Sequence, residues 1–405
     1  MLAHRPCISM NRDNLIARMA RAQAQRAEHS LLRRLRTLSA VDGPHIVVGG
    51  HRLLDFASND YLGLAQHPAL VSALTDAARA GGVGARAAHL LGGHRDEHAA
   101  LETELAQWTG RERALLFSTG YMANLGVLQA LLERGDLCVQ DKRNHACLID
   151  GALLSAAELR RYPHADVAAA KRQLVLRSHA PALLATDGVF SMDGDVAPLR
   201  ELAALCRDQG ATLMVDDAHG IGVLGAQGAG SLAEAGLDQD DAPVLMATLG
   251  KALGVAGAFV AGSAALIDGL VQFARTYLYT TAMPPALAAA THASVRIART
   301  EDWRREHLDQ LIAQFRDGAA QRGIVLSPSR TPIQPVVLGA SARALDVAVR
   351  LEDAGFFVPA IRPPTVTEGS ARLRVSLSSA HARTDVERLL EALTAAGAHT
   401  RGEGA

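Results

Sequence analysis

Residues Pro181–Gly220, PALLATDGVFSMDGDVAPLRELAALCRDQGATLMVDDAHG, contain two short apolar runs separated by a segment with helical periodicity. The runs ALLATD and TLMV have the length and composition of buried β-strands, whereas residues 198–209 repeat apolar side chains at helical spacing. A strand, a helix and a second strand in this order predict two parallel strands joined by a crossover helix. This unit predicts an α/β fold.

The same alternation extends from this unit in both directions. The other predicted strands are RALLFSTG, DLCVQD, ELRRYP, VLMATLGK and GAFVAG. Helical patterns lie between the earlier ones, such as HRDEHAALETELAQWTG, which places Leu101, Leu105 and Trp108 on one face. Short apolar strands separated by helices predict a mostly parallel sheet that is covered by helices on both faces.

The pattern changes after YTTAMPPA. Long helices are predicted from Pro285 to about Gly323, followed by TPIQPVVLG, a helix at 341–355, FFVPAIRPPTV, ARLRVSLSS and a helix from Thr384. This mixture predicts a smaller α+β unit. We therefore expect an N-terminal helix and small strand segment at 1–60, a large α/β domain at 61–300 and a C-terminal α+β domain at 301–405.

Composition limits the class of protein. The chain has 405 residues, of which 49% are hydrophobic and 20% charged, as expected for a globular chain with a large core. Lys and Arg number 41 against 42 Asp and Glu, and the calculated pI is near 7.0. Without a basic excess, we expect neither nucleic acid nor an anionic membrane surface as a partner.

Targeting signals are weak. No apolar run reaches membrane-spanning length, and the N-terminus lacks the apolar core of a secretory signal. The scattered cysteines show no zinc-type spacing and favour a reducing compartment, the cytoplasm. They are Cys7, Cys138, Cys147 and Cys206.

The Arg-rich N-terminal segment has two interpretations. Helical spacing of apolar residues predicts a helix docked on the rest of the chain, whereas a mitochondrial transit segment is the alternative. The apolar residues are Leu15, Met19, Leu31, Leu32 and Leu35. Initiation at Met1 or at Met10 stays open.

Lysine is rare in this chain, which contains Lys142, Lys171 and Lys251 only. The first two stand beside arginine, as solvated residues do. Lys251 lies in MATLGKALGVAGAF, among small and apolar residues. A desolvated amine can lose its proton and form an imine, which a guanidinium cannot do. The structural alternative is a lysine whose head reaches water from a strand end.

Polar residues follow the predicted carboxyl ends of four strands, where parallel sheets bind ligands. They are Ser118–Tyr121, Asp187, Asp216–His219 and Thr248–Lys251. The STGYMAN turn can bind a phosphate through backbone N–H groups at a helix start. Asp216, directly after an apolar strand, requires donors or a cationic partner, which a protonated ring nitrogen supplies.

The nearby histidines have structural alternatives, since His145 begins a helix and His219 alone is typical of a hydrogen-bonded histidine. No metal is expected, because no pair among Asp216, Asp217, His219 and His145 has helical i, i+4 spacing. An anion-binding turn, a carboxylate for a ring nitrogen and an imine-forming lysine are together the requirements of pyridoxal 5′-phosphate (PLP). PLP is the expected cofactor.

Eight blocks of this chain resemble the α-oxoamine synthases, a family of fold-type I PLP enzymes. The blocks are FASNDYLGL, STGYMAN, NHACLIDGALLS, TDGVFSMDGDVAPL, VDDAHGIGVLG, TLGKALGVAGAFVAG, YTTAMPPA and AIRPPTV with ARLRVSLSSAH. They stand in the family's order and run nearly end to end. The resemblance implies the fold-type I architecture, with a large PLP-binding domain and a smaller C-terminal domain.

The resemblance implies catalytic roles at four matching residues. Lys251 would form a Schiff base with the cofactor and act as acid and base at the substrate Cα. Asp216 would pair with the pyridine nitrogen, and His219 would hydrogen-bond the ring oxygen. His145 would stack on the ring.

The same resemblance implies further ligand-binding residues. Ser191 would lie near the ring, and the phosphate would be held by Gly120, Tyr121 and Thr248, joined by Thr281 from the second subunit of a homodimer with shared sites. Arg374 would bind the amino-acid carboxylate, with Asn59 and Arg33 close to the substrate.

The implied reaction is a decarboxylative condensation of L-alanine with a pimeloyl thioester in biotin biosynthesis. Coenzyme A and a carrier protein stay open as the thiol, with Arg33, Arg34 and Arg36 as candidates for contacting an acidic carrier. A relative with another acyl group or amino acid, such as a glycine C-acetyltransferase-like enzyme, is the alternative.

Two other classes are disfavoured. A non-catalytic partner subunit would lack the imine lysine, and GGVGAR fails as a dinucleotide fingerprint because no convincing strand precedes it. The chain departs from the family in two motifs. Ala88 and His89 stand where many relatives have Ser-Arg or Ser-His, and Asp187 stands where Glu is common, which leaves acyl-substrate details open.

Overall fold

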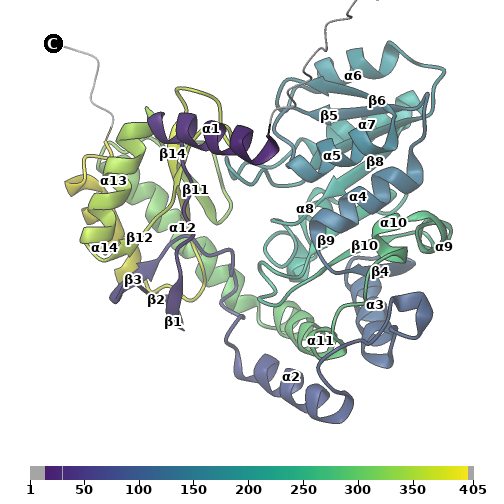
Figure 1. The fold of residues 1–405 in the computed structure, drawn as a ribbon, viewed down its shortest axis with the longest axis horizontal. Coiled ribbons are helices and arrows are strands. Elements are labelled where there is room, and N and C mark those ends of the chain that lie inside the picture. The colour runs from purple at the N-terminus through teal and green to yellow at the C-terminus, as the bar shows by residue number, and fades with distance from the viewer. Residues whose placement is uncertain (1–13, 30, 400–405) are drawn as a thin grey trace, which may run out of the picture.

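The computed structural model describes residues 14–29 and 31–399. Cys7 and the two candidate start residues lie outside the described residues. A seven-stranded sheet, right in Figure 1, forms the centre of the larger part of the molecule. Its strands, in spatial order, are β4 (Arg113–Phe117), β10 (Ala258–Gly262), β9 (Val244–Thr248), β8 (Thr212–Asp216), β7 (Ala182–Asp187), β5 (Leu137–Asp141) and β6 (Glu158–Tyr162).

The predicted α/β class and mostly parallel sheet are confirmed. All neighbouring strands are parallel except β10, which runs antiparallel to both β4 and β9. The β9–β10 connection, residues 249–257, contains no helix and is too short for a parallel crossover. The chain therefore turns back directly after Lys251, which holds this lysine at the carboxyl edge of the sheet.

Helices cover both faces of this sheet. Along β8, Leu213 and Val215 pack into one apolar layer and Met214 into the other, as the twofold alternation of a strand requires. The first layer includes α6 (Val167–Val175), α7 (Leu199–Gln209) and α8 (Ser231–Ala235). The second includes α4 (Gly120–Leu131), α5 (Ala146–Ser155), α9 (Ala264–Phe273) and α10 (Arg275–Leu278).

The smaller part of the molecule, left in Figure 1, contains two further sheets. One orders β11 (Ile333–Gly339), β14 (Ala371–Ser376) and β13 (Ala360–Ile361); the other orders β1 (Leu38–Asp42), β2 (His45–Val48), β3 (His51–Asp55) and β12 (Phe356–Phe357). Because β3 pairs with β12, the N-terminal strands join the C-terminal part of the chain. The predicted boundaries at 60 and 300 stay a prediction.

The remaining helices connect and cover these two parts. They are α2 (Pro68–Gly81), α3 (Asp96–Trp108), α11 (Pro285–Thr300), α12 (Asp302–Gln321), α13 (Ser341–Asp353), α14 (Arg383–Ala395) and the short 3₁₀ turns η1 (His89–Leu91) and η2 (Ala226–Gly228). The predicted α3 face is buried, with Leu101, Leu105 and Trp108 in the core. Among the described residues, no helix has the length and apolar character needed to cross a membrane.

The N-terminal helix differs from its prediction. Helix α1 (Leu15–Glu28) begins at Asn14, whose side chain accepts from the backbone N–H groups of Ile16 and Ala17. Every described side chain of α1 is exposed, so the docking that the apolar spacing predicted is not made within one chain. The later apolar residues, Leu31, Leu32 and Leu35, follow the helix in a segment without regular structure.

Candidate active site

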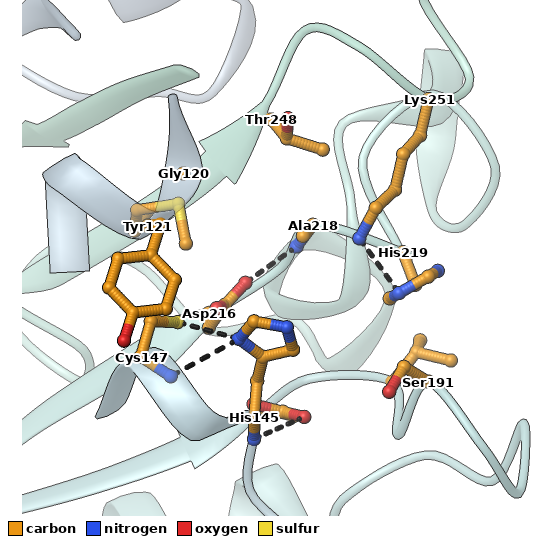
Figure 2. A pocket seen from close by; sticks show the side chains of 13 residues that line it. Gly120, Tyr121, His145, Cys147, Ser191, Asp216, Ala218, His219, Thr248 and Lys251 are labelled. Atoms are coloured by element: carbon orange, nitrogen blue, oxygen red, sulfur yellow. Dashed lines mark hydrogen bonds between the residues drawn. The ribbon is translucent and has the colours of Figure 1, made fainter. Parts of the chain in front are cut away.

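A cavity of about 190 Å³ lies at the carboxyl ends of the central strands. Its walls contain eight of the residues predicted to hold a cofactor, namely Gly120, Tyr121, His145, Ser191, Asp216, His219, Thr248 and Lys251. Figure 2 shows these side chains, drawn from separate strand ends and loops, around one space. The remaining wall residues are Cys147, Asp187, Val189, Ala218 and Met246.

Lys251 enters this cavity from the turn after β9. Its Nζ lies 2.7 Å from Nε2 of His219, and no carboxylate among the described residues forms an ion pair with it. Burial lowers the pKa of Lys251 to about 8, although the charges of Asp216 and Asp187 act in the opposite direction. A buried amine with this pKa is a much stronger nucleophile at neutral pH than an ordinary lysine.

His219 connects the lysine to a second polar chain. Its Nδ1 lies 2.8 Å from the Tyr61 hydroxyl, which donates to Oδ1 of Asn59 over 3.0 Å. Since the tyrosine hydrogen points to Asn59, we assign the His219 hydrogen to Nδ1, leaving Nε2 to accept from the lysine. Burial, reinforced by the charges of Lys251 and Arg374, lowers the pKa of His219 well below its usual value and keeps the ring neutral.

Arg374, in the smaller part of the molecule, contacts the backbone of the wall residue Ser191. On β14, Leu373 and Val375 face the apolar core, so Arg374 points to the opposite side. It donates to the Ser191 carbonyl over 2.7 Å, to the Ser376 hydroxyl over 2.7 Å and to Asn59 Oδ1 over 3.2 Å. No carboxylate among the described residues pairs with this buried guanidinium, which leaves it available for an anionic ligand.

Asp216 is held as a carboxylate acceptor at the back of the cavity. Asn124 Nδ2 donates to one oxygen over 2.7 Å, and the Ala218 N–H donates to the other over 3.0 Å. Asn124 is fully buried on α4. The two donors fix the carboxylate while the wall side remains accessible to a ring nitrogen.

His145 stands at the start of α5 on another wall. Its backbone N–H donates to the Asp187 carboxyl, with N–O distances of 3.2 and 3.3 Å, while its Nδ1 lies 2.8 Å from Cys147 Sγ. Burial, followed by the nearby charge of Asp216, raises the pKa of Asp187 well above its usual value. The Asp187 side chain, one methylene shorter than the glutamate that is common in relatives, accepts the bond from this N–H and so positions the backbone that carries His145.

The start of α4 forms the wall predicted to bind a phosphate. Thr119 caps this helix by accepting from Met122 N–H over 3.1 Å, and the N–H groups of Gly120 and Tyr121 in the first turn have no intrahelical acceptor. Gly120 lies next to Thr248, because a Cβ atom added at Gly120 would be 4.0 Å from the Cβ atom of Thr248. This arrangement suits a phosphate group.

Four predicted residues lie outside the cavity wall, namely Arg374, Asn59, Thr281 and Arg33. Asn59 accepts from the Tyr61 hydroxyl, which contacts His219 of the wall. Thr281 is exposed in the segment between α10 and α11. Arg33 donates to the Thr365 hydroxyl over 3.1 Å. Thr281 and Arg33 are thus not brought to the lysine within one chain.

Thr365 belongs to a second groove of about 630 Å³, which shares His145 and Ser191 with the lysine cavity. Its basic residues are Lys142, Arg143, Arg161 and Arg372, and its apolar residues include Ile149, Phe190 and Val366. Arg143 and Arg372 both pair with Asp193. Lys142 and Arg161 are exposed and form no ion pair among the described residues.

The residues fit the PLP expectation. The unpaired buried amine of Lys251 matches an aldehyde, fixed Asp216 matches a ring nitrogen, and the α4 start matches a phosphate. Sequence reasoning missed three supporting residues, Tyr61, Asn124 and Cys147, although all three lie inside quoted blocks. Their signal, a polar side chain within an apolar block, does not reveal which partner it meets.

Comparisons with known proteins support the same interpretation. The family model for aminotransferase class I and II matches residues 51–393. Among curated relatives, the 8-amino-7-oxononanoate synthase of Alkalilimnicola ehrlichii is 55% identical over 95% of this chain and 98% of its own. That of Pseudomonas putida is 56% identical over 93% of this chain and 96% of its own.

Solved structures show the same fold. A serine palmitoyltransferase from S. paucimobilis with a bound PLP–myriocin aldimine is similar with a TM-score of 0.90 and 27% identity, covering 95% of this chain and 98% of that chain. The 8-amino-7-oxononanoate synthase of Francisella tularensis is similar with a TM-score of 0.75 and 31% identity, covering 85% and 97%.

Proposed function

Because the chain belongs to the aminotransferase class I and II family, we propose that it is a PLP-dependent acyltransferase with the activity of its 8-amino-7-oxononanoate synthase relatives. It condenses L-alanine with a pimeloyl thioester and releases 8-amino-7-oxononanoate, carbon dioxide and the free thiol, a step of biotin biosynthesis. The observation that carries the chemistry is the buried amine of Lys251, which shares the cavity with Asp216 and forms no ion pair among the described residues.

The cavity walls supply candidate contacts for the aldehyde, ring and phosphate of PLP, and Thr281 of the second subunit would add one to the phosphate. Lys251 would hold its aldehyde carbon, Asp216 its ring nitrogen, and the first turn of α4 with Thr248 its phosphate, while His145 would contact the ring. When bound, PLP supplies an electron sink for negative charge at the Cα of an attached amino acid. His219 would contact the ring oxygen, with Ser191 nearby in the same wall.

Arg374 orients the alanine. It is a buried cation whose donors already point to Ser191, Ser376 and Asn59, so its guanidinium plane is fixed before a carboxylate arrives. A carboxylate anchored there places the alanine Cα between Arg374 and the Lys251 amine. This pre-positioning reduces the entropy cost of the proton transfer.

Lys251 moves the proton. Its neutral amine takes the proton from the alanine Cα and returns one to the condensed product after carbon dioxide has left. His219 accepts from this amine through Nε2, and burial, reinforced by the nearby positive charges, lowers its pKa and keeps the ring neutral. The histidine therefore orients the amine without competing for its proton.

The acyl donor approaches through the basic groove. The groove opens onto His145 and Ser191, and its apolar wall suits an aliphatic arm, while Lys142 and Arg161 suit the phosphates of coenzyme A or of a carrier protein's prosthetic arm. Arg33 reaches the groove wall at Thr365, in agreement with a contact to the acyl substrate.

The proposed assembly is a homodimer in the cytoplasm. Exposure of Thr281 and of the apolar residues of α1 supports a second subunit that uses these surfaces. Three described cysteines, Cys138, Cys147 and Cys206, are free and buried, which supports a reducing compartment.

The test is a substrate matrix. Purified holoenzyme is incubated with alanine, serine or glycine, each with pimeloyl-, palmitoyl- or acetyl-CoA, and thiol release and products are measured beside Lys251→Ala. We expect the alanine and pimeloyl pair to have the highest kcat/KM and the variant to be inactive. A preference for serine with palmitoyl-CoA, or for glycine with acetyl-CoA, would keep the family chemistry and overturn the assigned substrates.

A further inference from the structure

Three histidines form a cluster outside the lysine cavity. His89 lies in η1, His94 in the following turn and His98 in the first turn of α3. One nitrogen from each ring lies within 4.8 Å of the other two. The ring centroids are 5.2 Å apart for His89 and His94, 5.1 Å for His89 and His98, and 5.5 Å for His94 and His98.

These ring separations match those of histidines that bind the same metal ion. Zinc–imidazole bonds of about 2.0–2.1 Å in a tetrahedral arrangement place ligand nitrogens about 3.3 Å apart. The Nδ1 atoms of His89 and His94 already lie 3.0 Å apart. Burial lowers the pKa of each ring, that of His89 to about 4, which favours the neutral form that binds metals.

A surrounding group orients one of the rings as a partner of a metal-bound histidine does, and a carboxylate lies near a second ring. Nε2 of His98 donates to the Met283 carbonyl over 2.8 Å, and Nε2 of His94 lies 3.7 Å from the Glu102 carboxylate. His98 Nδ1 accepts from the Arg95 N–H over 3.0 Å. Coordination through this nitrogen would replace that one capping bond.

We propose that His89, His94 and His98 bind one divalent transition-metal ion of the zinc class. His94 is the most exposed of the three and also lines a surface groove of about 430 Å³ with Glu102, which provides an entry path and room for a water ligand. This site is separate from the Lys251 cavity and does not depend on the proposed reaction.

The ion would stabilise the packing between three neighbouring segments of the chain. His89 stacks on Tyr277 of α10 with centroids 4.9 Å apart, and His98 holds Met283 two residues after Thr281. The Ala282 N–H donates to the Ala87 carbonyl over 3.0 Å. Coordination therefore connects the turn around His89, helix α3 and the segment that carries Thr281.

The test measures zinc binding by chelator-treated holoenzyme. We expect about one Zn²⁺ per chain after desalting, and a rise in the thermal midpoint on zinc addition. His94→Gln, at an exposed position that folding tolerates, should weaken the zinc Kd at least about 100-fold, and Glu102→Gln should weaken it about 10–100-fold. His179→Gln, at an exposed histidine outside the cluster, should bind like the wild type.

Two results would overturn the proposal. Equal zinc retention by wild type and His94→Gln would show adventitious binding elsewhere. If the wild type does not retain zinc, the three histidines form a hydrogen-bonded cluster and not a metal site. Co²⁺ in place of zinc gives an independent readout, because tetrahedral coordination produces ligand-field absorption that His94→Gln should lose even if its stability is unchanged.

Discussion

The lowered pKa of Lys251 has a kinetic consequence that can be measured on the apoenzyme. Only the neutral amine attacks an aldehyde. With a pKa of about 8, about one molecule in ten is neutral at pH 7, whereas with the ordinary value of 10.5 about three in 10,000 are neutral. The ratio of these fractions predicts a roughly 300-fold advantage over an ordinary lysine at this pH.

The assay follows capture of PLP by apoenzyme, trapped with borohydride at pH 6 to 10. Because the pKa is lowered, the amine is charged below pH 8, so the capture rate should rise about tenfold per pH unit up to about pH 8 and then level off. Asp216→Asn should move this inflection lower, because the Asp216 charge raises the pKa of the lysine.

Lys251→Ala provides the background, since Lys142 and Lys171 are the only other lysines and both are exposed. A wild-type rate that continues to rise through pH 9 would refute the argument, because it would show that burial does not alter this amine. An unchanged or raised inflection in Asp216→Asn would refute the assigned charge coupling.

Three further predictions concern the surroundings of the site. Tyr61→Phe removes the acceptor for His219 Nδ1 and should lower kcat about tenfold and destabilise the fold by about 1–3 kcal/mol in urea unfolding; an unchanged kcat would contradict the hydrogen-bonded chain. The double variant Lys142→Gln/Arg161→Gln should raise the KM for pimeloyl-CoA about tenfold but leave that for a phosphate-free pimeloyl thioester unchanged, and an equal effect on both would place the phosphates elsewhere. Leu105→Ala, in the fully buried α3 face, should cost about 2–5 kcal/mol of unfolding free energy, and a loss under 1 kcal/mol would show that the face is loosely packed.

Local sequence patterns were sufficient for the larger sheet. Each strand there is a short apolar run followed by polar residues, and parallel pairing brings those ends to one edge without further information. The positions of Asp216 and Lys251 at one cavity follow from this rule. The direction of β10 also follows from sequence once the absence of a helix in residues 249–257 is noticed.

Contacts between distant segments could not be predicted in the same way. Tyr61 meets His219 from 158 residues away, and β3 pairs with β12 across some 300 residues of chain. Apolar periodicity reports that a side chain is buried but not what it packs against. The histidine cluster shows the same limit, since His89 joins His94 and His98 only after η1 turns the chain back.

The N-terminal helix shows a limit of another kind. Its apolar spacing correctly predicted a helix, but Leu15, Ile16 and Met19 face solvent in the single chain. A surface that is buried by a second subunit has the same sequence pattern as one buried within the chain. Sequence alone therefore cannot assign the partner of such a helix.

The proposed enzyme joins alanine to a pimeloyl thioester with loss of carbon dioxide. Isotope labelling tests this reaction most directly. Holoenzyme is incubated with pimeloyl-CoA and alanine that carries ¹³C either in its carboxyl group or in its methyl group. The mass of the product is then measured by mass spectrometry. We expect the carboxyl label to leave as carbon dioxide and the methyl label to remain in 8-amino-7-oxononanoate. A product that keeps the carboxyl label, or that lacks the methyl label, would contradict the proposed reaction.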